Sequence, residues 1–386
     1  MNICVSELCS GCSLCADVCP RNAVIMKRDE EGFFRPYIDD SLCIDCGLCQ
    51  KKCPVNTKNP SIAGEVYAAY SKRSEIREKS SSGGIFYHIA DSILRSGGVV
   101  FGAGYGEDMK IVHKCVDSHE GLKELMGSKY VQSNTQGVYK TIKEYVAEGK
   151  KVLFSGTPCQ CAAVRSYIGE NENLYLVDFI CHGVPTPSLW EKYIREEFPK
   201  AKAASFRSKD IGWEEFSMRI ETGEKTYSCS QYKDPYLRMF LKNTPLRLSC
   251  YNCTWKGNDG YSSNITLADF WGISKVYPWM NDDKGTSVVI VRDEKGKEIF
   301  DLISKDLILK QTDIKDIAKI NVAYGESASK PESREAFFED MKKGLSFKEL
   351  SAAYAKPLSQ KEIIKIRAKR QIKKLLSKIY GFRNRK

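Results

Sequence analysis

The chain has 386 residues, 42% of them hydrophobic and 28% charged, which is enough for about two or three domains with buried cores. This composition excludes a largely disordered, a collagen-like and a multi-spanning membrane protein. The net charge of +11 comes from residues 356–386, which hold twelve Lys or Arg and one acid, so residues 1–355 are neutral overall. The basic tail has only Tyr380 and Phe382 to stack on bases, and we therefore predict no nucleic-acid partner.

Cysteine is the most informative residue type in this sequence. Sixteen cysteines occur, and eight of them lie between Cys9 and Cys53. The opening segment MNICVSELCSGC has neither the charged start nor the apolar core of a signal peptide, and no apolar stretch is long enough for a membrane helix. We therefore predict a cytoplasmic protein whose thiols bind metal rather than form disulfides.

Two cysteine runs share the spacing C-x2-C-x2-C-x3-C-P, one ending at Pro20 and the other at Pro54. The pattern resembles that of bacterial two-cluster ferredoxins, in which the fourth cysteine of each run binds the cluster of the other run. The predicted ligands of the first 4Fe-4S cluster are Cys9, Cys12, Cys15 and Cys53, and those of the second are Cys43, Cys46, Cys49 and Cys19. CxxC pairs also occur in zinc sites, but repetition of the whole run with both prolines favours the clusters. Cys4 lies outside the pattern, and we expect it to take no part in the site.

The fold class is predicted as α+β. The cysteine runs define a ferredoxin-like domain over residues 1–60, with cluster-shielding strands at 23–26 and 33–38, and residues 56–64 form the predicted linker. Over residues 65–345, short β-branched or aromatic runs alternate with amphipathic stretches, which predicts a mixed α/β domain.

Regular elements of this larger domain are predicted from hydrophobic periodicity. Strands are expected at 66–71, 99–105, 151–155, 174–179, 217–221, 265–270 and 287–292. Helices are expected at 84–95, 137–148, 158–168, 187–198 and 295–304. Residues 222–224 have the composition of a hairpin tip. Gly102, Gly104 and Gly106 lack the third spacing of a GxGxxG fingerprint, which argues against an NAD(P)-binding Rossmann site.

Two loops precede predicted helices and have unusual composition. Residues 80–84 (SSSGG) offer backbone N–H groups and hydroxyls to an anion or a polar ring edge. In the other loop, Thr157 suits the N-cap and Pro158 the first helical position. Cys159 would then lie in the first turn, where the helix field lowers a thiol pKa. Taken singly, either loop could equally be an ordinary capping loop.

Several motifs occur together in a fixed order along the body of the chain. They are SSGGIF (81–86), GSKYVQS (127–133), GTPCQ (156–160), DFICHGVP (178–185), FRS (206–208) followed by Gly212–Trp213, LRLSCYNC (246–253) and ITLADFWG (265–272). From about residue 80 to about residue 292, the chain therefore resembles the coenzyme F420 hydrogenase/dehydrogenase beta-subunit family. The resemblance implies an iron–sulfur flavoprotein that holds FAD. Some members pass electrons between a reduced deazaflavin and a chain of clusters, and some carry an added ferredoxin domain.

The resemblance also implies roles for individual residues. Residues expected to face the reacting groups are Ser82, Gly83, Lys129 and Asp269. Residues expected to bind FAD are Ser82, Gly83, Gly84, Lys129, Gln132, Gly156, Thr157, Pro158, Cys159 and Gln160. Two of these residues have a structural alternative. Lys129 could be a surface lysine in a salt bridge, and Asp269 could cap the turn at Trp271.

A third 4Fe-4S cluster is implied as well, because family members without the ferredoxin extension still carry one. Its expected ligands are Cys159, Cys181, Cys250 and Cys253. The alternative is that Cys159 and Cys181 are small buried hydrophobic side chains. His182 is either a proton carrier or a hydrogen-bonded loop histidine. The remaining cysteines, Cys115, Cys161 and Cys229, are expected in the core or on the surface.

A flavin accepts a hydride as two electrons and releases single electrons to iron–sulfur clusters. The predicted function is therefore an oxidoreductase that links a hydride-carrying small molecule, such as coenzyme F420 or a metabolite, to a redox partner protein or a ferredoxin. The alternative is a non-catalytic electron-transfer subunit or adaptor of a larger redox complex.

A basic amphipathic helix is predicted within residues 355–386, spanning 359–382. Its apolar stripe consists of Ile364, Ala368, Ile372, Leu375, Ile379 and Phe382. Such a helix either lies on an anionic membrane surface, which would make the protein peripheral at the inner face of the membrane, or packs its stripe on the body.

Overall fold

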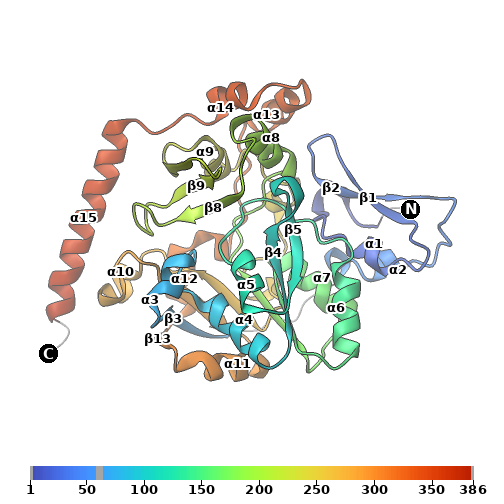
Figure 1. The fold of residues 1–386 in the computed structure, drawn as a ribbon, viewed down its shortest axis with the longest axis horizontal. Coiled ribbons are helices and arrows are strands. Elements are labelled where there is room, and N and C mark those ends of the chain that lie inside the picture. The colour runs from blue at the N-terminus through green and yellow to red at the C-terminus, as the bar shows by residue number, and fades with distance from the viewer. Residues whose placement is uncertain (1–2, 58–63, 384–386) are drawn as a thin grey trace.

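The structure is a computed structural model that describes residues 3–57 and 64–383. Its centre is an eight-stranded mixed sheet with the order β13-β3-β12-β11-β7-β6-β4-β5 (Figure 1). The strands are β3 (Glu65–Ser71), β4 (Val99–Tyr105), β5 (Ile111–Val116), β6 (Val152–Ser155), β7 (Leu174–Phe179), β11 (Ile265–Asp269), β12 (Ser287–Val291) and β13 (Leu307–Thr312). Strands β3, β11, β7, β6 and β4 run in one direction, since β12 is antiparallel to both β3 and β11. Their carboxyl ends share one border of the sheet, the carboxyl edge.

Helices cover both faces of this sheet. Side chains alternate along a strand, so Val100 and Leu153 point to one face while Val99 and Val152 point to the other. The helices packed on the first face are α4 (Ile85–Arg95), α5 (His119–Leu125) and α11 (Glu294–Ser304). Those packed on the second face are α6 (Val138–Ala147) and α7 (Pro158–Ile168). Burial on both faces explains why the central strands read as continuous apolar runs.

A second, three-stranded sheet lies beyond the carboxyl edge. It consists of β8 (Ala203–Ser208), β9 (Ser217–Glu221) and β10 (Thr226–Ser230), all antiparallel. The predicted hairpin tip is confirmed, because Glu221 pairs with Thr226. An aromatic core that includes Trp190, Phe206 and Tyr236 joins this sheet to surrounding helices. These helices are α8 (Pro187–Glu197), α9 (Pro235–Leu241), α13 (Arg334–Lys342) and α14 (Phe347–Tyr354).

The N-terminal region packs against the side of the body formed by α6 and α7 (Figure 1). Its elements are α1 (Leu14–Val18), β1 (Val24–Arg28), β2 (Phe34–Ile38) and α2 (Leu48–Lys51). Asp17 accepts hydrogen bonds from the backbone N–H groups of Gly137 (2.8 Å) and Tyr139 (3.1 Å), so it caps α6 from outside the body. Of the predicted linker, residues 58–63 lie outside the described residues.

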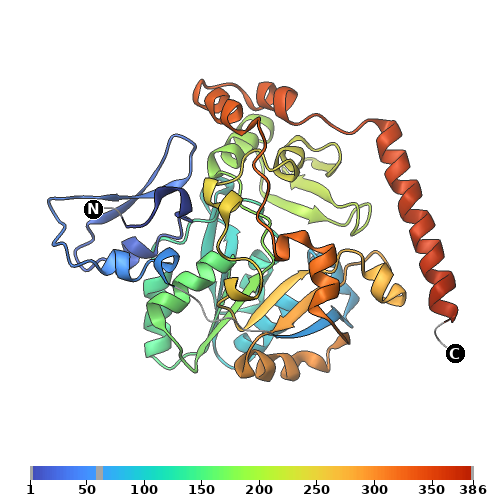
Figure 2. The ribbon, with the colours of Figure 1, turned by 180° about the vertical axis from the view of Figure 1, so that it is seen from behind.

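The C-terminal helix α15 (Gln360–Arg383) stands at the opposite end of the molecule from the N-terminal region (Figures 1 and 2). Arg367 ties it to Glu215 through hydrogen bonds of 2.9 and 2.6 Å. The predicted stripe does not face the body: Ile364, Ile372 and Leu375 are 57%, 56% and 61% exposed. The side chains of Ile379 and Phe382 lie outside the described residues. Packing of the stripe on the body is therefore wrong for the three residues named. No helix among residues 3–57 and 64–383 is long and apolar enough to cross a membrane.

All predicted strands and helices are present, with ends shifted by one or two residues in most cases. The four strands that the sequence did not predict are β5, β8, β10 and β13, and each lies at the border of a sheet. Such strands are half exposed and carry polar residues, as the sequence LILKQT of β13 illustrates. They therefore lack the apolar pattern on which the predictions depended.

Candidate functional site

The four cysteines predicted for the first cluster come together in the N-terminal region. Cys15 lies on α1, and its thiol interacts electrostatically with the thiols of the other three cysteines, Cys9, Cys12 and Cys53. Burial raises the pKa of the Cys12 thiol to about 12. A bound metal would supply the positive charge that stabilises a thiolate at this depth.

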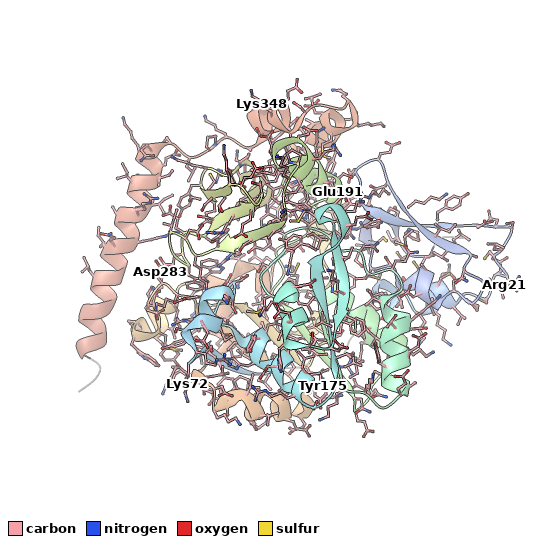
Figure 3. The ribbon with its side chains drawn as sticks, in the orientation of Figure 1. Arg21, Lys72, Tyr175, Glu191, Asp283 and Lys348 are labelled. Atoms are coloured by element: carbon pink, nitrogen blue, oxygen red, sulfur yellow. The ribbon has the colours of Figure 1, made fainter. Side chains whose placement is uncertain are left out.

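The second predicted set lies farther from the body. Its members line one hollow together with Arg21 and Ile44: Cys19, Cys43, Cys46 and Cys49. Cys46 is exposed, and Arg21 stands at the outer edge of the molecule (Figure 3). The second set is thus the one nearest to solvent.

Cys4 corrects an expectation from the sequence. It was expected to take no part in the site, but its side chain hydrogen bonds with the thiols of Cys9 and Cys53. The hydrogen bond from Cys4 is the largest cause that lowers the pKa of Cys9 to about 5. The first set therefore has a fifth thiol beside it, which the regular spacing gave no reason to expect.

The four cysteines expected in the body line a single cavity: Cys159, Cys181, Cys250 and Cys253. Cys159 lies at the start of α7 and Cys181 in the loop after β7. Cys250 lies in the 3-10 helix η4 (Leu248–Asn252), and Cys253 is the C-cap of that helix. Because β6 and β7 are adjacent and parallel, the segments that follow them meet at the carboxyl edge. All four residues are partly exposed, whereas Cys161 is buried in the core. The structure therefore brings the four expected ligands together, and their binding of a cluster stays a prediction.

The loop before α7 has the predicted local structure. Thr157 is the N-cap, Pro158 is the first helical residue, and the Thr157 backbone N–H donates to Gln160 Oε1 (2.9 Å). One expectation is wrong: burial raises the pKa of the Cys159 thiol, although its helical position predicts the opposite. Desolvation therefore outweighs the field of the helix at this site.

The spacing of the cysteine sets bears on the zinc alternative. Within the part of the chain that the structure describes, no three Cys, His, Asp or Glu side chains are close enough to hold one metal ion. A zinc ion draws its thiolates to about 2.3 Å from a single point. The assignment of these sets to 4Fe-4S clusters stays the prediction made from the two repeated runs.

Two side chains lie between the body set and the first ferredoxin set. Gln132, expected at the FAD, donates from Nε2 to the Ser10 carbonyl (3.0 Å), and Arg247 Nη1 donates to Gln132 Oε1 (3.3 Å). Both residues line the cavity of the body cysteines. Arg247 is a site residue that was not predicted from the sequence, although it lies within the LRLSC motif. The two sets are neighbours, since the thiols of Cys12 and Cys159 interact electrostatically.

Ser82 and Gly83 lie at the carboxyl edge, beside the end of β3. The Gly83 N–H donates to Ser287 Oγ (2.9 Å), and the Ser82 hydroxyl donates to the Thr286 carbonyl (3.1 Å). A Cβ on Gly83 would stand 2.5 Å from the Ala69 carbonyl oxygen, so only glycine fits. Gly84 has φ +89° and begins α4. The SSGG segment is therefore pressed tightly against two strands.

Asp269 ends β11 at the same edge. Its carboxylate pairs with Arg207 Nη1 (2.8 Å) and accepts from Trp213 Nε1 (3.1 Å), and these contacts replace the expected alternative of a turn cap at Trp271. The Arg207 guanidinium lies 4.1 Å from the ring centre of Phe216. Its Nε and Nη2 atoms are buried without a hydrogen-bond partner among the described residues. Two N–H donors are thus available at this edge.

Lys129 has a third kind of environment. Its ammonium group donates to the carbonyls of Glu124 (3.1 Å), Leu125 (3.1 Å) and Met126 (2.8 Å), which end helix α5. Burial lowers the pKa of Lys129 to about 7. The alternative of a surface salt bridge is wrong, and contact of Lys129 with a cofactor stays a prediction.

The predicted site residues fall into two groups along one edge. Ser82, Gly83 and Asp269 form an edge group, whereas Gln132 and residues 157–160 belong with the cysteine cavity. The GSKYVQS segment connects the groups: the Ser128 N–H donates to Ser81 Oγ (2.7 Å) at one end, and Gln132 contacts Ser10 at the other.

His182 also lines the cysteine cavity. Its Nε2 atom lies 2.6 Å from Asn243 Oδ1, and burial lowers its pKa. It therefore has the environment of a hydrogen-bonded loop histidine.

Models of known protein families match both the body of the chain and its N-terminal region. Residues 66–140 match the N-terminal model, and residues 149–327 the C-terminal model, of the coenzyme F420 hydrogenase/dehydrogenase beta subunit. Together these segments make up more than half of the chain. The chain belongs to the coenzyme F420 hydrogenase/dehydrogenase beta-subunit family. Residues 8–57 match the 4Fe-4S dicluster domain.

This beta-subunit membership makes the protein an iron–sulfur redox protein of an electron-transfer family. The two beta-subunit matches include the edge group, the cysteine cavity and Arg247. A solved chain from the F420-reducing [NiFe] hydrogenase complex of Methanosarcina barkeri, derivatised with xenon, is 17% identical, with a TM-score of 0.47 over 66% of this chain and 84% of that chain. No curated protein has a matching sequence.

Proposed function

We propose that this protein is an iron–sulfur flavoprotein oxidoreductase that uses FAD to exchange electrons between a hydride-carrying small molecule and its 4Fe-4S clusters. One observation supports this most strongly. Four body cysteines from three distant segments line one cavity, and that cavity adjoins the first ferredoxin set. Electron transfer along a chain of redox centres needs neighbouring centres to lie close together. The body set adjoins the first ferredoxin set, and the second ferredoxin set lies farther out, near solvent.

The residues that would hold the clusters follow from these sets. The ferredoxin-like region would bind two clusters, and Cys159, Cys181, Cys250 and Cys253 would bind a third. Lys256 lies beside the body set, donating to the Ala323 carbonyl (2.8 Å) and contacting the Cys181 carbonyl. A fixed positive charge there would favour the reduced form of a cluster, which carries more negative charge.

The carboxyl edge suits FAD for two reasons. The buried N–H groups of Arg207 need an acceptor, and the ring of a flavin has carbonyl and nitrogen acceptors at its border. The tight packing of Gly83 against Ala69 and Ser287 also fixes the SSGG loop at this edge, and a fixed loop can present its backbone N–H groups to a cofactor. Bound FAD would supply exchange of a hydride for single electrons. Asp269 would hold Arg207 in position, and Thr157 and Gln160 would fix the loop nearest to the cysteine cavity.

Anaerobic purification tests this proposal. We expect bound FAD together with iron, and bleaching of the flavin absorbance by reduced coenzyme F420, NAD(P)H or reduced ferredoxin, whichever donor is physiological. A protein with clusters but no FAD would support the alternative, a non-catalytic electron-transfer subunit.

The exposed second set supports a redox partner protein or a ferredoxin at the outer end of this chain of redox centres. Leu42 and Ile44 are 41% and 59% exposed beside Cys46, and apolar side chains at a surface centre suit transient docking. An Ile44→Asp substitution should slow electron transfer to an added ferredoxin and leave bleaching of the flavin by the small-molecule donor unchanged. Equal transfer rates would exclude docking at this surface.

Helix α15 supports peripheral contact with an anionic membrane. Its exposed Ile364, Ile372 and Leu375 lie among lysines, and the helix is held to the body through Arg367 and Glu215. Each Lys or Arg near an anionic surface adds about 1 kcal/mol to binding. Vesicles of phosphatidylserine and phosphatidylcholine should sediment the full chain more than the Ile372→Glu variant or a chain ending at Ala355. Equal sedimentation of all three would refute this role.

A further inference from the structure

Arg247 is the one buried cation that contacts the first ferredoxin set from within the body cavity among the described residues. Its side chain is fully buried, at 0% exposure. Nε donates to the Cys9 carbonyl (2.7 Å) and Nη2 to the Phe34 carbonyl (3.0 Å). Nη2 also lies 3.7 Å from Cys9 Sγ, within hydrogen-bond range of a thiolate. Its fork therefore binds a predicted cluster ligand through both backbone and sulfur.

The backbone of Arg247 belongs to the other set. Its N–H donates to the Val184 carbonyl (3.0 Å), and its carbonyl accepts from the Cys250 N–H (2.9 Å). Arg247 is also the N-cap of η4, which carries Cys250. One residue thus connects the loop that presents Cys250 to the loop that presents Cys9.

Close packing shows that the connection is specific. A Cβ on Gly11, where φ is +66°, would stand 2.8 Å from Arg247 Nη1 and 2.5 Å from Gln132 Nε2. The Arg247 guanidinium also lies 5.2 Å from the ring centre of Phe33. A side chain at Gly11 would push the guanidinium away from Cys9.

We propose that Arg247 is a positioning residue that holds the first ferredoxin cluster against the body cluster and raises the reduction potential of the cluster bound by Cys9. The inference rests on the proposed function, because it takes both cysteine sets as cluster ligands. Reduction adds a negative charge to a cluster, and a nearby buried cation favours that charge. A hydrogen bond to a ligand sulfur acts in the same direction. The second cluster, at the outer end, should be unaffected.

The test is a redox titration of the full protein, followed by electron paramagnetic resonance, with iron and flavin measured first. In Arg247→Gln, the midpoint potential of one cluster should shift to a more negative value, while that of the outer cluster stays the same. Arg247→Lys keeps the charge but loses the fork, so its shift should be in the same direction and smaller.

Arg334→Gln is the matched control. Arg334 is also a buried arginine between the two regions, but it pairs with Glu31 and donates to the Leu246 carbonyl. It should leave all midpoints unchanged. Unchanged midpoints in Arg247→Gln, or an equal shift in Arg334→Gln, would overturn the proposal. If Arg247→Gln loses iron, the Arg247→Lys titration decides, and an unshifted midpoint there overturns it too. Absence of flavin from the starting protein would instead refute the proposed function and leave this test valid.

Discussion

The ferredoxin-like region and the body bring their cysteines together in different ways. In the N-terminal region, each set takes three cysteines from one short loop and a fourth from the other run. In the body, Cys159, Cys181 and the pair Cys250 and Cys253 are far apart in sequence. Cys159 and Cys181 meet because β6 and β7 end at the same edge, and the segment around η4 lines the same cavity. The ferredoxin motif can thus be recognised from the spacing of its cysteines alone. Assembly of the body cavity depends instead on which strands are neighbours in the sheet.

The largest expected effect is a loss of iron from the body set that leaves the ferredoxin-like region unchanged. Cys250→Ser should remove iron equivalent to one cluster, about four irons per chain, while the ferredoxin signals persist. The reason is that Cys250 lines the body cavity only. Iron analysis and electron paramagnetic resonance measure this result. Cys161→Ser is the control, because Cys161 is buried in the core two residues after Cys159. Unchanged iron in Cys250→Ser would leave the body cysteines as ordinary side chains.

The second-largest effect is expected at Gly83, where the SSGG loop packs against the ends of two strands at the carboxyl edge. Gly83→Ala places a Cβ 2.5 Å from the Ala69 carbonyl oxygen, so we expect a loss of about 1–3 kcal/mol in stability, together with loss of flavin. Thermal unfolding and flavin content measure these changes. Gly325→Ala is the control, because no atom lies within 4 Å of a Cβ at that position. It should change stability by less than about 0.5 kcal/mol. Equal losses in both variants would contradict the tight packing at Gly83.

The same contrast explains what the sequence could predict. The cysteine runs, the Thr157 cap and the helices of 10 or 11 residues were predicted correctly, since their signals are local. Helices of the body with at most nine residues, such as α9 and α13, were missed because too few turns reveal a period.

Contacts across the fold explain the remaining failures. Arg247 lies 238 residues from Cys9, and nothing local indicates that the two meet. The contact of the Gln132 amide with the ferredoxin loop at Ser10 also joins residues far apart in sequence, and binding of FAD by Gln132 stays a prediction. The contact of Lys129 with the end of α5 could not be predicted, because α5 is a helix of seven residues that shows too few turns in the sequence.

A smaller effect tests the burial of the body near the end of β6. Burial lowers the pKa of His113 from 6.5 to about 4, and the ring stacks on Phe154 while Nε2 lies 3.1 Å from the Ser155 carbonyl. Between these pH values the unfolded chain binds a proton that the folded chain does not. Stability is therefore fully present above about pH 6.5 and falls as the pH drops toward 4, by about 2 kcal/mol at pH 5.

His113→Gln should remove this dependence, so the difference in unfolding temperature between pH 7 and pH 5 should shrink. His119→Gln is the control, because the exposed His119 ring contacts Asp91 and not the core, and this variant should not shrink the difference. If His113→Gln keeps the wild-type difference, other groups cause the sensitivity to acid.

The smallest effect lies at the joint between the two regions. Asp17 caps α6 through the N–H groups of Gly137 and Tyr139, and both bonds cross from the ferredoxin-like region to the body. Asp17→Ala should lower stability by about 1 kcal/mol, and Asp17→Asn by less, because asparagine also caps helices well. Thermal unfolding of the two variants measures the loss. Iron content should stay at the wild-type value in both, since each cysteine set is assembled within its own region. Loss of iron in Asp17→Asn would show that the ferredoxin-like region depends on the body to hold its clusters, and the distinction between local and topological assembly would then fail.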